Sequence, residues 1–482
     1  MMAQPLRHET PQTTLPAVPL WPRLLPLGLP FVLGLVVLCL PTPSGLSLAG
    51  QRVLAVTALA IGLWVGEALP VGVTSMLVVL ALVLSGGVPG FREALAGFAE
   101  PVAYFLIAVL TLGLAVLRSG LAERVARFFL RQCRGRPRAL YLQLLLAFPL
   151  LTLLLPSATT RTGILIHVYD QALTLSHVPR GAPLARAIMM ALNSINRLAS
   201  TVLLTGGITP VVSAALIGNI GWSRWLVLMG VPYGVLLALG AGLIYWLYRE
   251  SFAAPLPNVP DQESVPLSAV ELRTASITLG ASLLWLTDAL HHWHPAIPAL
   301  LAFLCLLTPG LGVLTWSDFE RNLGWANFFV LASSLSLAQA LASSGASAWT
   351  AQLLVRRLPG LMQQPVLIIA VLLVAVLPVR LLIPNITGFL GITIPLAMSI
   401  GSTTGLNPII CGLVVMIAGD AVLYYPAQSA SSLVVYERGH LSGAEIFRFG
   451  VWMTLVAYVV VLGVALPYWA LVGEPLQVGA RP

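Results

Sequence analysis

Two polar segments share the frame P-x-x-T-x-x-x-G-I, at residues 156–164 and 384–392, and each one interrupts a long apolar run. Backbone inside hydrocarbon must satisfy its hydrogen bonds internally, so a polar turn at that depth persists only where protein or a water-filled cavity surrounds it. A matched pair of such breaks in corresponding parts of a chain is typical of a transporter's binding site. The sequence therefore predicts membrane helices with two polar breaks around one site.

Apolar residues fill almost the whole chain. Of its 482 residues 58% are hydrophobic and 9% are charged, which is too apolar for a water-soluble domain. Stretches near the roughly 20 residues that span a bilayer follow one another, and this favours a bundle of helices over a barrel of strands. We expect an integral, multi-pass protein of the bacterial inner membrane, with the lipid bilayer as a partner.

Charge and cysteine usage exclude other classes of function. The net charge of +8 comes from arginine alone, and no basic patch with interleaved aromatic residues predicts nucleic-acid binding. The four cysteines are scattered without C-x-x-C spacing, so neither a disulfide framework nor a zinc site is predicted. We expect no catalytic residues, and no cofactor or metal other than a coupling ion.

One polar stretch divides the chain into halves. Residues 249–272 hold four prolines and several acidic residues, which predicts a linker, and we expect it on the cytoplasmic side. Residues 1–50 comprise a tail and an extra first helix, residues 51–248 the first half and residues 273–472 the second.

Three landmarks recur in both halves. Trp64–Leu69 matches Trp285–Leu290, and Arg118–Gly120 has a weaker echo in Ser343–Gly345. Together with the shared polar frame, these matches lie 221, 225 and 228 residues apart and keep the same order. Such a nearly constant spacing predicts an internal repeat.

The apolar arms beside each polar break are short for a full crossing. We therefore interpret residues 139–176 and 365–402 as re-entrant hairpins with the polar frame at the tip, and two kinked full spans are the alternative. Each half then has about five crossings plus one hairpin, so the halves are expected to be inverted. The predicted fold is an all-α polytopic membrane protein.

Arginines predict how the hairpins face the membrane. The segment 118–138 holds seven arginines, which places the mouth of the first hairpin in the cytoplasm by the positive-inside rule. Arg356 and Arg357, before the second hairpin, argue against this orientation.

At each tip one short helix ends and another begins, so free carbonyls and free amides meet at one place. Carbonyl and hydroxyl oxygens suit a small hard cation such as sodium, whereas helix N-termini suit an anion. Ser157, Thr159, Asn385 and Thr387 are the predicted caps. The combination predicts a cation-coupled carrier of a small anionic substrate, and the alternative is that these residues only satisfy backbone at a kink.

Several motifs together resemble the divalent anion/sodium symporter family. They are Glu67–Pro70 followed by Thr74 and Ser75, Ser119–Leu121 with Arg124, Pro156–Arg161, Gly405–Pro408 and Arg448–Gly450. The resemblance runs from about residue 50 to about residue 470. The family's first tip reads Ser-Asn-Thr, to which Ser157 and Thr159 correspond, while Ala158 lacks the amide; the second tip is matched more loosely.

The resemblance implies a homodimer that carries di- or tricarboxylates or sulfate with sodium by an elevator movement. Family members also have an unwound loop after each hairpin, for which Thr205–Pro210 and Pro426–Ser431 stand here. The expected substrate-binding residues are Ser157, Thr159, Arg161, Thr205, Asn385, Thr387, Gln428 and Ser429. The expected cation-binding residues are Ser157, Thr159, Gly206, Gly207, Asn385, Thr387 and Ala427.

Other charged residues inside the apolar runs have alternative interpretations. Arg161 either faces the substrate or is structural, and Arg380 is expected to pair with Asp420. If the coupling ion is a proton, Asp170, His167 and Asp420 are the candidate carriers. The polar cluster Asn193, Asn196 and Arg197 either lines the cavity or joins helices.

Three other functions remain as alternatives to a sodium-coupled carrier. The first is a proton-coupled or exchange-type anion carrier, and the second is a receptor or scaffold that binds an anion without transport. The third, more remote, is an intramembrane aspartyl protease, because Tyr169–Asp170 and Gly419–Asp420 resemble the paired aspartate motifs of those enzymes.

Overall fold

The computed structural model describes residues 21–66, 69–131, 133, 135–155, 157–218, 220–253, 266–356 and 364–477. Of the residues named above, Glu67, Ala68, Pro156 and Arg357 lie outside this part of the chain, as do residues 1–20 of the predicted tail, one arginine of the segment 118–138 and residues 254–265 of the predicted linker. Within the described residues, all the named secondary-structure elements are helices. Eight of these helices are long and apolar enough to cross a membrane, so the prediction of an all-α, multi-pass membrane protein is confirmed.

The extra first helix is α1 (Trp21–Cys39), and the first half follows with α2 (Leu48–Gly66), α3 (Val71–Leu84), α4 (Phe91–Ala94), α5 (Pro101–Ser119), α6 (Leu121–Arg131), α7 (Pro137–Leu154), α8 (Ala158–Leu175), α9 (Pro183–Met190), α10 (Asn196–Thr201), α11 (Ile208–Ile217) and α12 (Trp222–Leu247). The second half contains α13 (Ala269–Leu286), α14 (Asp288–His291), α15 (Ala296–Leu307), α16 (Trp316–Asn322), α17 (Trp325–Ser343), α18 (Ala346–Arg356), α19 (Pro365–Leu382), α20 (Ile386–Thr404), α21 (Pro408–Asp420), α22 (Ala430–Tyr436), α23 (Gly443–Val460) and α24 (Leu466–Leu471).

The order and length of the helices repeat. Helices α5 and α17 both have 19 residues, α6 and α18 both have 11, and α7 and α19 both have 18. A break follows α7 and α19 alike, and a long helix of about the same length, α8 or α20, comes next. The order and lengths of these helices agree with an internal repeat, and the repeat and the inversion of its two halves stay predictions.

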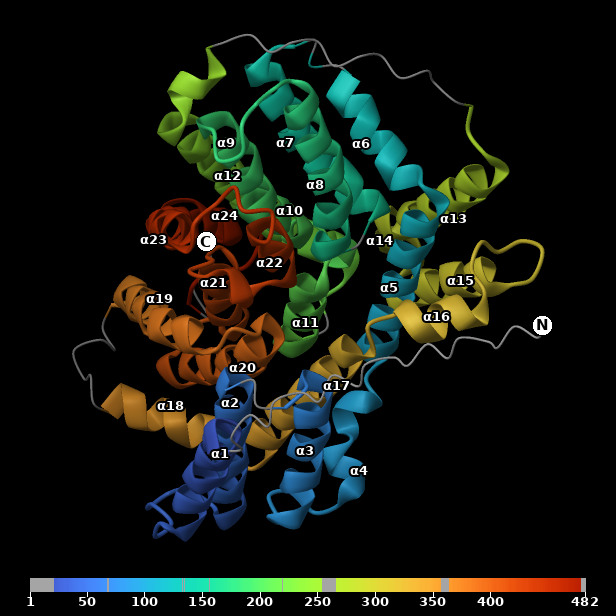
Figure 1. Ribbon diagram of the computed structural model, residues 1–482. Coiled ribbons are helices and arrows are strands. Elements are labelled where there is room, and N and C mark those ends of the chain that lie inside the picture. The colour runs from blue at the N-terminus through green and yellow to red at the C-terminus, as the bar shows by residue number, and fades with distance from the viewer. Residues whose placement is uncertain are drawn as a thin grey trace, which may run out of the picture.

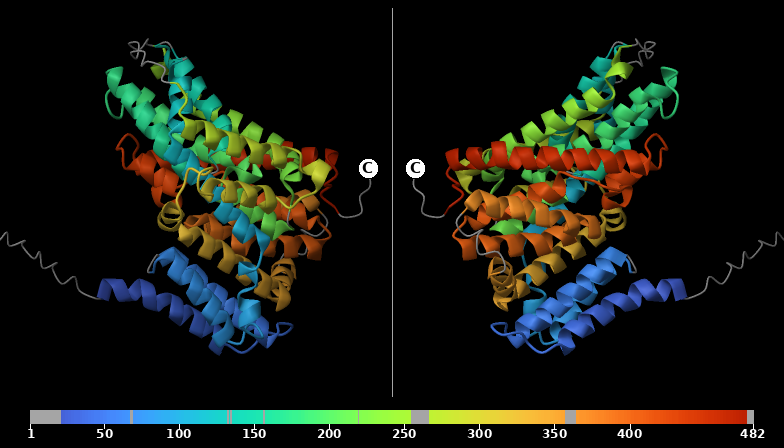
Figure 2. Two further views of the ribbon diagram at one scale, coloured as in Figure 1. Left: turned by 90° about the vertical axis from the view of Figure 1, so that its right-hand side faces the viewer. Right: turned by 90° about the vertical axis from the view of Figure 1, so that its left-hand side faces the viewer.

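The two halves pack into one body with the helices of each half interleaved. Helix α3 packs on α17, α5 on α15, and α20 on both α17 and α21. Figure 1 shows α1 to α4 at one end of the molecule and α6 to α9 at the other, and both views in Figure 2 show the first helices set apart in the same way. One large apolar cluster joins both halves, and a smaller one packs α2 and α3 against α17 and α18.

Two pairs of helices, α7 with α8 and α19 with α20, occupy the segments predicted as hairpins. The expectation that these arms are short is wrong, because each helix has 18 or 19 residues, and α7, α19 and α20 are long and apolar enough to cross a membrane. Re-entrant hairpins and kinked full spans thus both stay predictions. The backbone turns extended at Leu155 and Ser157 in the first pair, and at Ile383 and Asn385 in the second. Pro384 has no N–H to continue a helix. New helices then start at capping side chains, because Ser157 Oγ accepts from the Thr160 N–H at 3.3 Å and Asn385 Oδ1 from the Thr387 N–H at 2.9 Å.

A second kind of break lies after each helix pair. Between α10 and α11 a short helical turn, Leu204–Gly206, joins the two helices, and between α21 and α22 the turn Pro426–Gln428 does the same. Gly206 is required here, since a Cβ atom at this position would lie 2.0 Å from the carbonyl oxygen of Ser200. These turns coincide with the predicted unwound loops.

Candidate functional site

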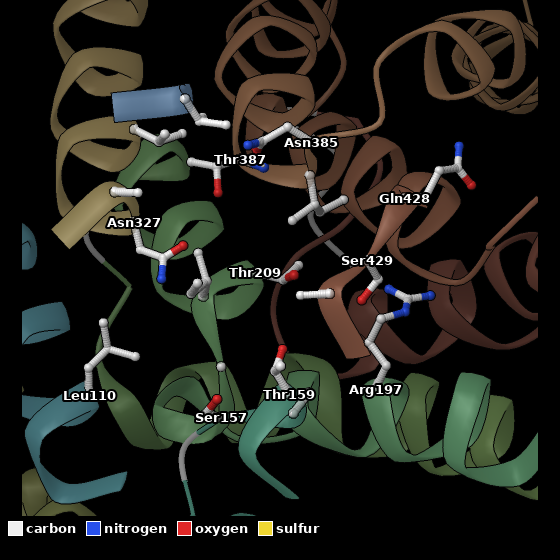
Figure 3. A pocket seen from close by; sticks show the side chains of 18 of the residues that line it. Leu110, Ser157, Thr159, Arg197, Thr209, Asn327, Asn385, Thr387, Gln428 and Ser429 are labelled. Carbon is white, nitrogen blue, oxygen red and sulfur yellow. Dashed lines mark hydrogen bonds between the residues drawn. The ribbon is translucent and has the colours of Figure 1, made fainter. Parts of the chain in front are cut away.

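A cavity of about 530 Å³ lies where the four breaks meet. Figure 3 shows side chains from both halves of the chain around it, with Ser157 and Thr159 facing Asn385 and Thr387 across the space. Each of the four breaks contributes to its polar lining, through residues 157–160, 207–210, 384–387 and 427–430. The elements that the sequence marks as breaks therefore build one shared site.

One wall of the cavity is apolar. It comes from α2, α5 and α17 and consists of Leu63, Trp64, Leu110, Leu114, Leu117, Ala326 and Val330. Among the described lining residues none is acidic, whereas two arginines, Arg197 and Arg380, contribute to the surface. The site thus combines hydroxyl, amide and guanidinium groups with a hydrocarbon-like wall.

Four helices begin at the cavity. The residue before the first turn lines it in each case: Ser157 for α8, Gly207 for α11, Asn385 for α20 and Ser429 for α22. The first N–H groups of a helix have no partner within that helix and carry partial positive charge. The caps Ser157 and Asn385 already accept from N–H groups of α8 and α20, whereas α11 and α22 have no side-chain cap. The partial positive charge of these helix ends favours a bound anion.

Most of the predicted site residues line this cavity, and three do not. Ser157, Thr159, Gly207, Asn385, Thr387, Ala427, Gln428 and Ser429 are in the lining. Arg161, Thr205 and Gly206 are not. Thr205 is buried, and its hydroxyl accepts a hydrogen bond from the Trp222 indole at 3.3 Å. This bond ties the first unwound turn to α12.

Gln428 lines the cavity, and its side-chain amide makes two hydrogen bonds within the protein. Its Oε1 accepts from the Tyr424 N–H at 2.7 Å, and its Nε2 donates to the Arg380 carbonyl at 2.8 Å. These bonds tie the second unwound turn to the end of α19. The residue therefore shapes the site, while Ser429 beside it leaves a hydroxyl next to the cavity.

Arg161 lies behind the first tip and is completely buried. Its Nη1 donates to the Leu155 carbonyl at 2.6 Å and its Nε to Asn196 Oδ1 at 3.0 Å. Its Nη2 donates to the Asn196 carbonyl at 3.1 Å and to the Ser200 hydroxyl. The structure thus assigns Arg161 to the support of the tip, and not to the substrate surface where the sequence analysis placed it.

Arg380 supports the second tip in the same manner. Its Nη1 donates to the carbonyls of Ile383 and Pro384 at 2.7 and 3.0 Å, and its Nε donates to the Gly419 carbonyl at 3.0 Å. The last carbonyls of a helix have no partner within it, so each tip uses one buried arginine to satisfy the carbonyls where its first helix ends. Unlike Arg161, Arg380 also contributes to the cavity wall.

The predicted ion pair between Arg380 and Asp420 is wrong, because Asp420 pairs with Arg197. The Arg197 Nη1 lies 2.6 Å from Asp420 Oδ1, while Thr201 Oγ1 and the Tyr233 hydroxyl donate to Oδ2 at 2.7 and 2.9 Å. Asp420 is fully buried and Arg197 is 8% exposed. This network joins α10, α12 and α21 at the edge of the cavity.

Arg197 lines the cavity, although the sequence analysis did not include it among the expected substrate- or cation-binding residues. The sequence signal was a polar cluster with Asn193 and Asn196 on one helix, for which lining and helix joining were both possible. The structure separates the three: Asn193 accepts from Ser432 at 2.6 Å and Asn196 holds Arg161, so both join helices. Only Arg197 of the three lines the cavity.

The residues proposed as proton carriers do not form one group. Asp170 accepts from His440 Nε2 at 3.0 Å and lies 4.0 Å from Arg438, which also contacts His167. None of these four residues lines the cavity. Asp170 and Asp420 have separate partners, so the paired aspartates of an intramembrane protease are not assembled here.

The family model described as the sodium:sulfate symporter transmembrane region matches residues 21–474. The chain belongs to this family. The match agrees with the resemblance seen in the sequence, and it makes the protein a transporter of this family and not an enzyme.

Relatives of this symporter family member include transporters from bacteria and plants. A "membrane protein" of Cupriavidus necator is 25% identical over 91% of both chains. The L-tartrate/succinate antiporter of Escherichia coli is 25% identical over 51% of both chains. The chloroplastic dicarboxylate transporter 2.2 of Arabidopsis thaliana is 22% identical over 94% of this chain and 85% of the relative.

A solved structure shares the fold. The YdaH transporter of Alcanivorax borkumensis superposes with a TM-score of 0.53 and 17% identity, covering 80% of this chain and 88% of that one. The similarity supports the arrangement of helices described above.

Proposed function

We propose that this symporter family member is a secondary transporter of small dicarboxylates. The observation that carries the proposal is the convergence of four helix N-termini and two arginines on a cavity whose described lining contains no acidic residue. Partial and full positive charges in a site shielded from water favour an anion. A volume of about 530 Å³ is within the range of small-molecule sites.

The apolar wall favours a dicarboxylate over sulfate. Leu63, Leu110 and Val330 offer a surface for methylene groups, which a compact inorganic anion does not have. Two relatives carry the names tartrate/succinate antiporter and dicarboxylate transporter, and these names agree with the same class. We therefore take succinate as the first substrate to test, with tartrate, citrate and sulfate as comparisons.

The buried arginines favour the exchange alternative over the sodium coupling that the sequence analysis expected. A sodium ion would need carbonyl and hydroxyl oxygens at the tips. The tip carbonyls of Leu155, Ile383 and Pro384 accept hydrogen bonds from Arg161 and Arg380 instead. Two fixed guanidinium charges thus stand close to where a coupling cation would offset the substrate's charge. Sodium symport remains the alternative in the test below.

We further propose the movement and assembly implied by the family resemblance. The two halves would be inverted repeats, and the hairpins would move with α10, α11, α21 and α22 as one elevator unit in each subunit of a homodimer in the bacterial inner membrane. The repeated order of helices supports this proposal, as does the way in which both tips and both unwound turns share one cavity.

The purified protein in lipid vesicles tests the transport proposal and its coupling. Exchange predicts that labelled succinate enters vesicles preloaded with unlabelled succinate, that empty vesicles take up at least about tenfold less, and that replacing sodium by potassium changes neither. Sodium symport predicts uptake into empty vesicles under an inward sodium gradient, and proton coupling predicts the same under a pH gradient. Vesicles without protein are the control.

The proposal of transport fails if none of the four anions enters under any of these conditions. Thermal stabilisation of the protein by succinate without any flux would instead favour the receptor alternative, since a ligand that binds the folded state raises its stability.

A further inference from the structure

Arg197 uses only one end of its guanidinium group. Nη1 binds Asp420, whereas Nε and Nη2 are shielded from solvent and have no hydrogen-bond partner among the described residues. The side chain is 10% exposed. By contrast, all three guanidinium nitrogens of Arg161 donate to protein oxygens. Arg197 therefore differs from the arginine that supports the first tip.

The two unmatched nitrogens form one recognition surface. The N–H of Nε and the adjacent N–H of Nη2 point in the same direction, in the fork that a carboxylate binds with both oxygens. Buried polar groups are nearly always matched, and an unmatched charged donor is costly. Arg197 lines the cavity, and Figure 3 shows its guanidinium group beside Ser429 at the cavity's edge. Because both nitrogens are shielded from solvent in this state, a small movement of the side chain or of its neighbours must open this edge before a ligand in the cavity can supply the missing acceptors.

We propose that Arg197 binds one carboxylate of the transported anion side-on through Nε and Nη2, while the other carboxylate is held by other polar groups of the cavity lining. This inference rests on the proposed function and names the residue that selects dianions at the same site. Two separate anchors in one cavity would favour an anion with two carboxylates over one that has a single carboxylate.

Asp420, Thr201 and Tyr233 act as positioning residues in this account. Asp420 holds Nη1 at 2.6 Å and is itself held by the two hydroxyl groups. Because Nη1 is fixed from α21, the opposite edge of the guanidinium group is turned away from Asp420 and stays free. Arg197, Thr201 and Tyr233 together donate three hydrogen bonds to the buried Asp420 carboxylate, so the ion pair has its partners before a substrate arrives.

The Arg197→Lys variant tests the proposal, because lysine can keep the ion pair with Asp420 but has no fork. We expect it to unfold within a few degrees of the wild-type protein and to bind succinate at least about tenfold more weakly. The preference for succinate over butyrate, which has one carboxylate, should shrink by a similar factor. Arg224→Lys is the matched control, because Arg224 pairs with Glu474 at 2.7 Å away from the cavity; it should change neither quantity.

A folded Arg197→Lys protein with wild-type succinate affinity and preference would overturn the inference while leaving the transport proposal intact. If this variant does not fold, the double variant Arg197→Gln with Asp420→Asn replaces it, because it leaves no lone buried charge. We expect the same weaker succinate binding and the same smaller preference over butyrate. A structure of the wild-type protein with succinate decides without any substitution: a carboxylate on Nε and Nη2 is expected, and one bound elsewhere contradicts the proposal. Absence of any dicarboxylate binding or flux in the wild-type protein would instead refute the proposed function.

Discussion

The Arg161→Met variant is expected to be strongly destabilised and to yield much less folded protein than the wild type. The substitution leaves the carbonyl of Leu155, the side-chain oxygen of Asn196 and the hydroxyl of Ser200 without their donor in a fully buried place. A buried acceptor without a partner costs about 1–3 kcal/mol, and native proteins are stable by only about 5–15 kcal/mol. Thermal unfolding of the purified protein in detergent, followed by size-exclusion chromatography, measures the effect.

The matched control is Arg186→Met, which removes an arginine whose side chain is 43% exposed and which pairs with Glu445. An exposed pair contributes about 1 kcal/mol or less, so this variant should unfold close to the wild-type temperature. An Arg161→Met protein that is as stable as the wild type but has lost succinate affinity would contradict our account. That outcome would mean that Arg161 binds the substrate, as the sequence analysis expected.

The Asp420→Ala variant is expected to be similarly destabilised, by about 3–5 kcal/mol, because it leaves the Arg197 charge buried without its partner. It also removes the acceptor of Thr201 and Tyr233. Removing both charges avoids the lone buried cation, so the double variant Arg197→Met with Asp420→Leu should recover a large part of the loss. Thermal unfolding of Arg197→Met, Asp420→Leu and the double variant gives the coupling energy. If Asp420→Ala and the double variant are equally destabilised, the unpaired Arg197 charge is not the cause of the lost stability.

Local features of the fold could be predicted from the sequence because each depends on neighbouring residues. The apolar runs gave the membrane class, and the breaks after α7 and α19 follow from the polar frames and the caps Ser157 and Asn385. The shared frame also predicted that the two tips serve one site, and the cavity contains residues from both. Eight of the eleven different residues predicted for the site line that cavity.

The partners of the buried charges could not be predicted, because they depend on contacts between distant segments. Asp420 lies 223 residues from Arg197 in the chain, and no pattern in the sequence links the two. Arg380 is close to the tip carbonyls in the sequence itself, yet a lone arginine suggests an acidic partner first, and this led to the wrong pairing. A charge within an apolar run thus predicts that a partner exists without showing which one.

The most direct test of the shared anion site uses a cysteine at Thr209, which lies between the two tips in Figure 3 and lines the cavity. The variant Thr209→Cys is made in a background in which the four native cysteines are replaced by alanine. The rate of its modification by a small, charged methanethiosulfonate reagent is then measured with and without succinate. Thr308→Cys, at an exposed position at the end of α15, serves as the control.

Our account predicts that succinate slows the modification of Thr209→Cys at least about fivefold, because the anion fills the space between the tips. Butyrate should protect less, and the Thr308→Cys rate should not change. A Thr209→Cys protein that still exchanges succinate but is modified at the same rate with and without it would place the anion site elsewhere and contradict the central claim.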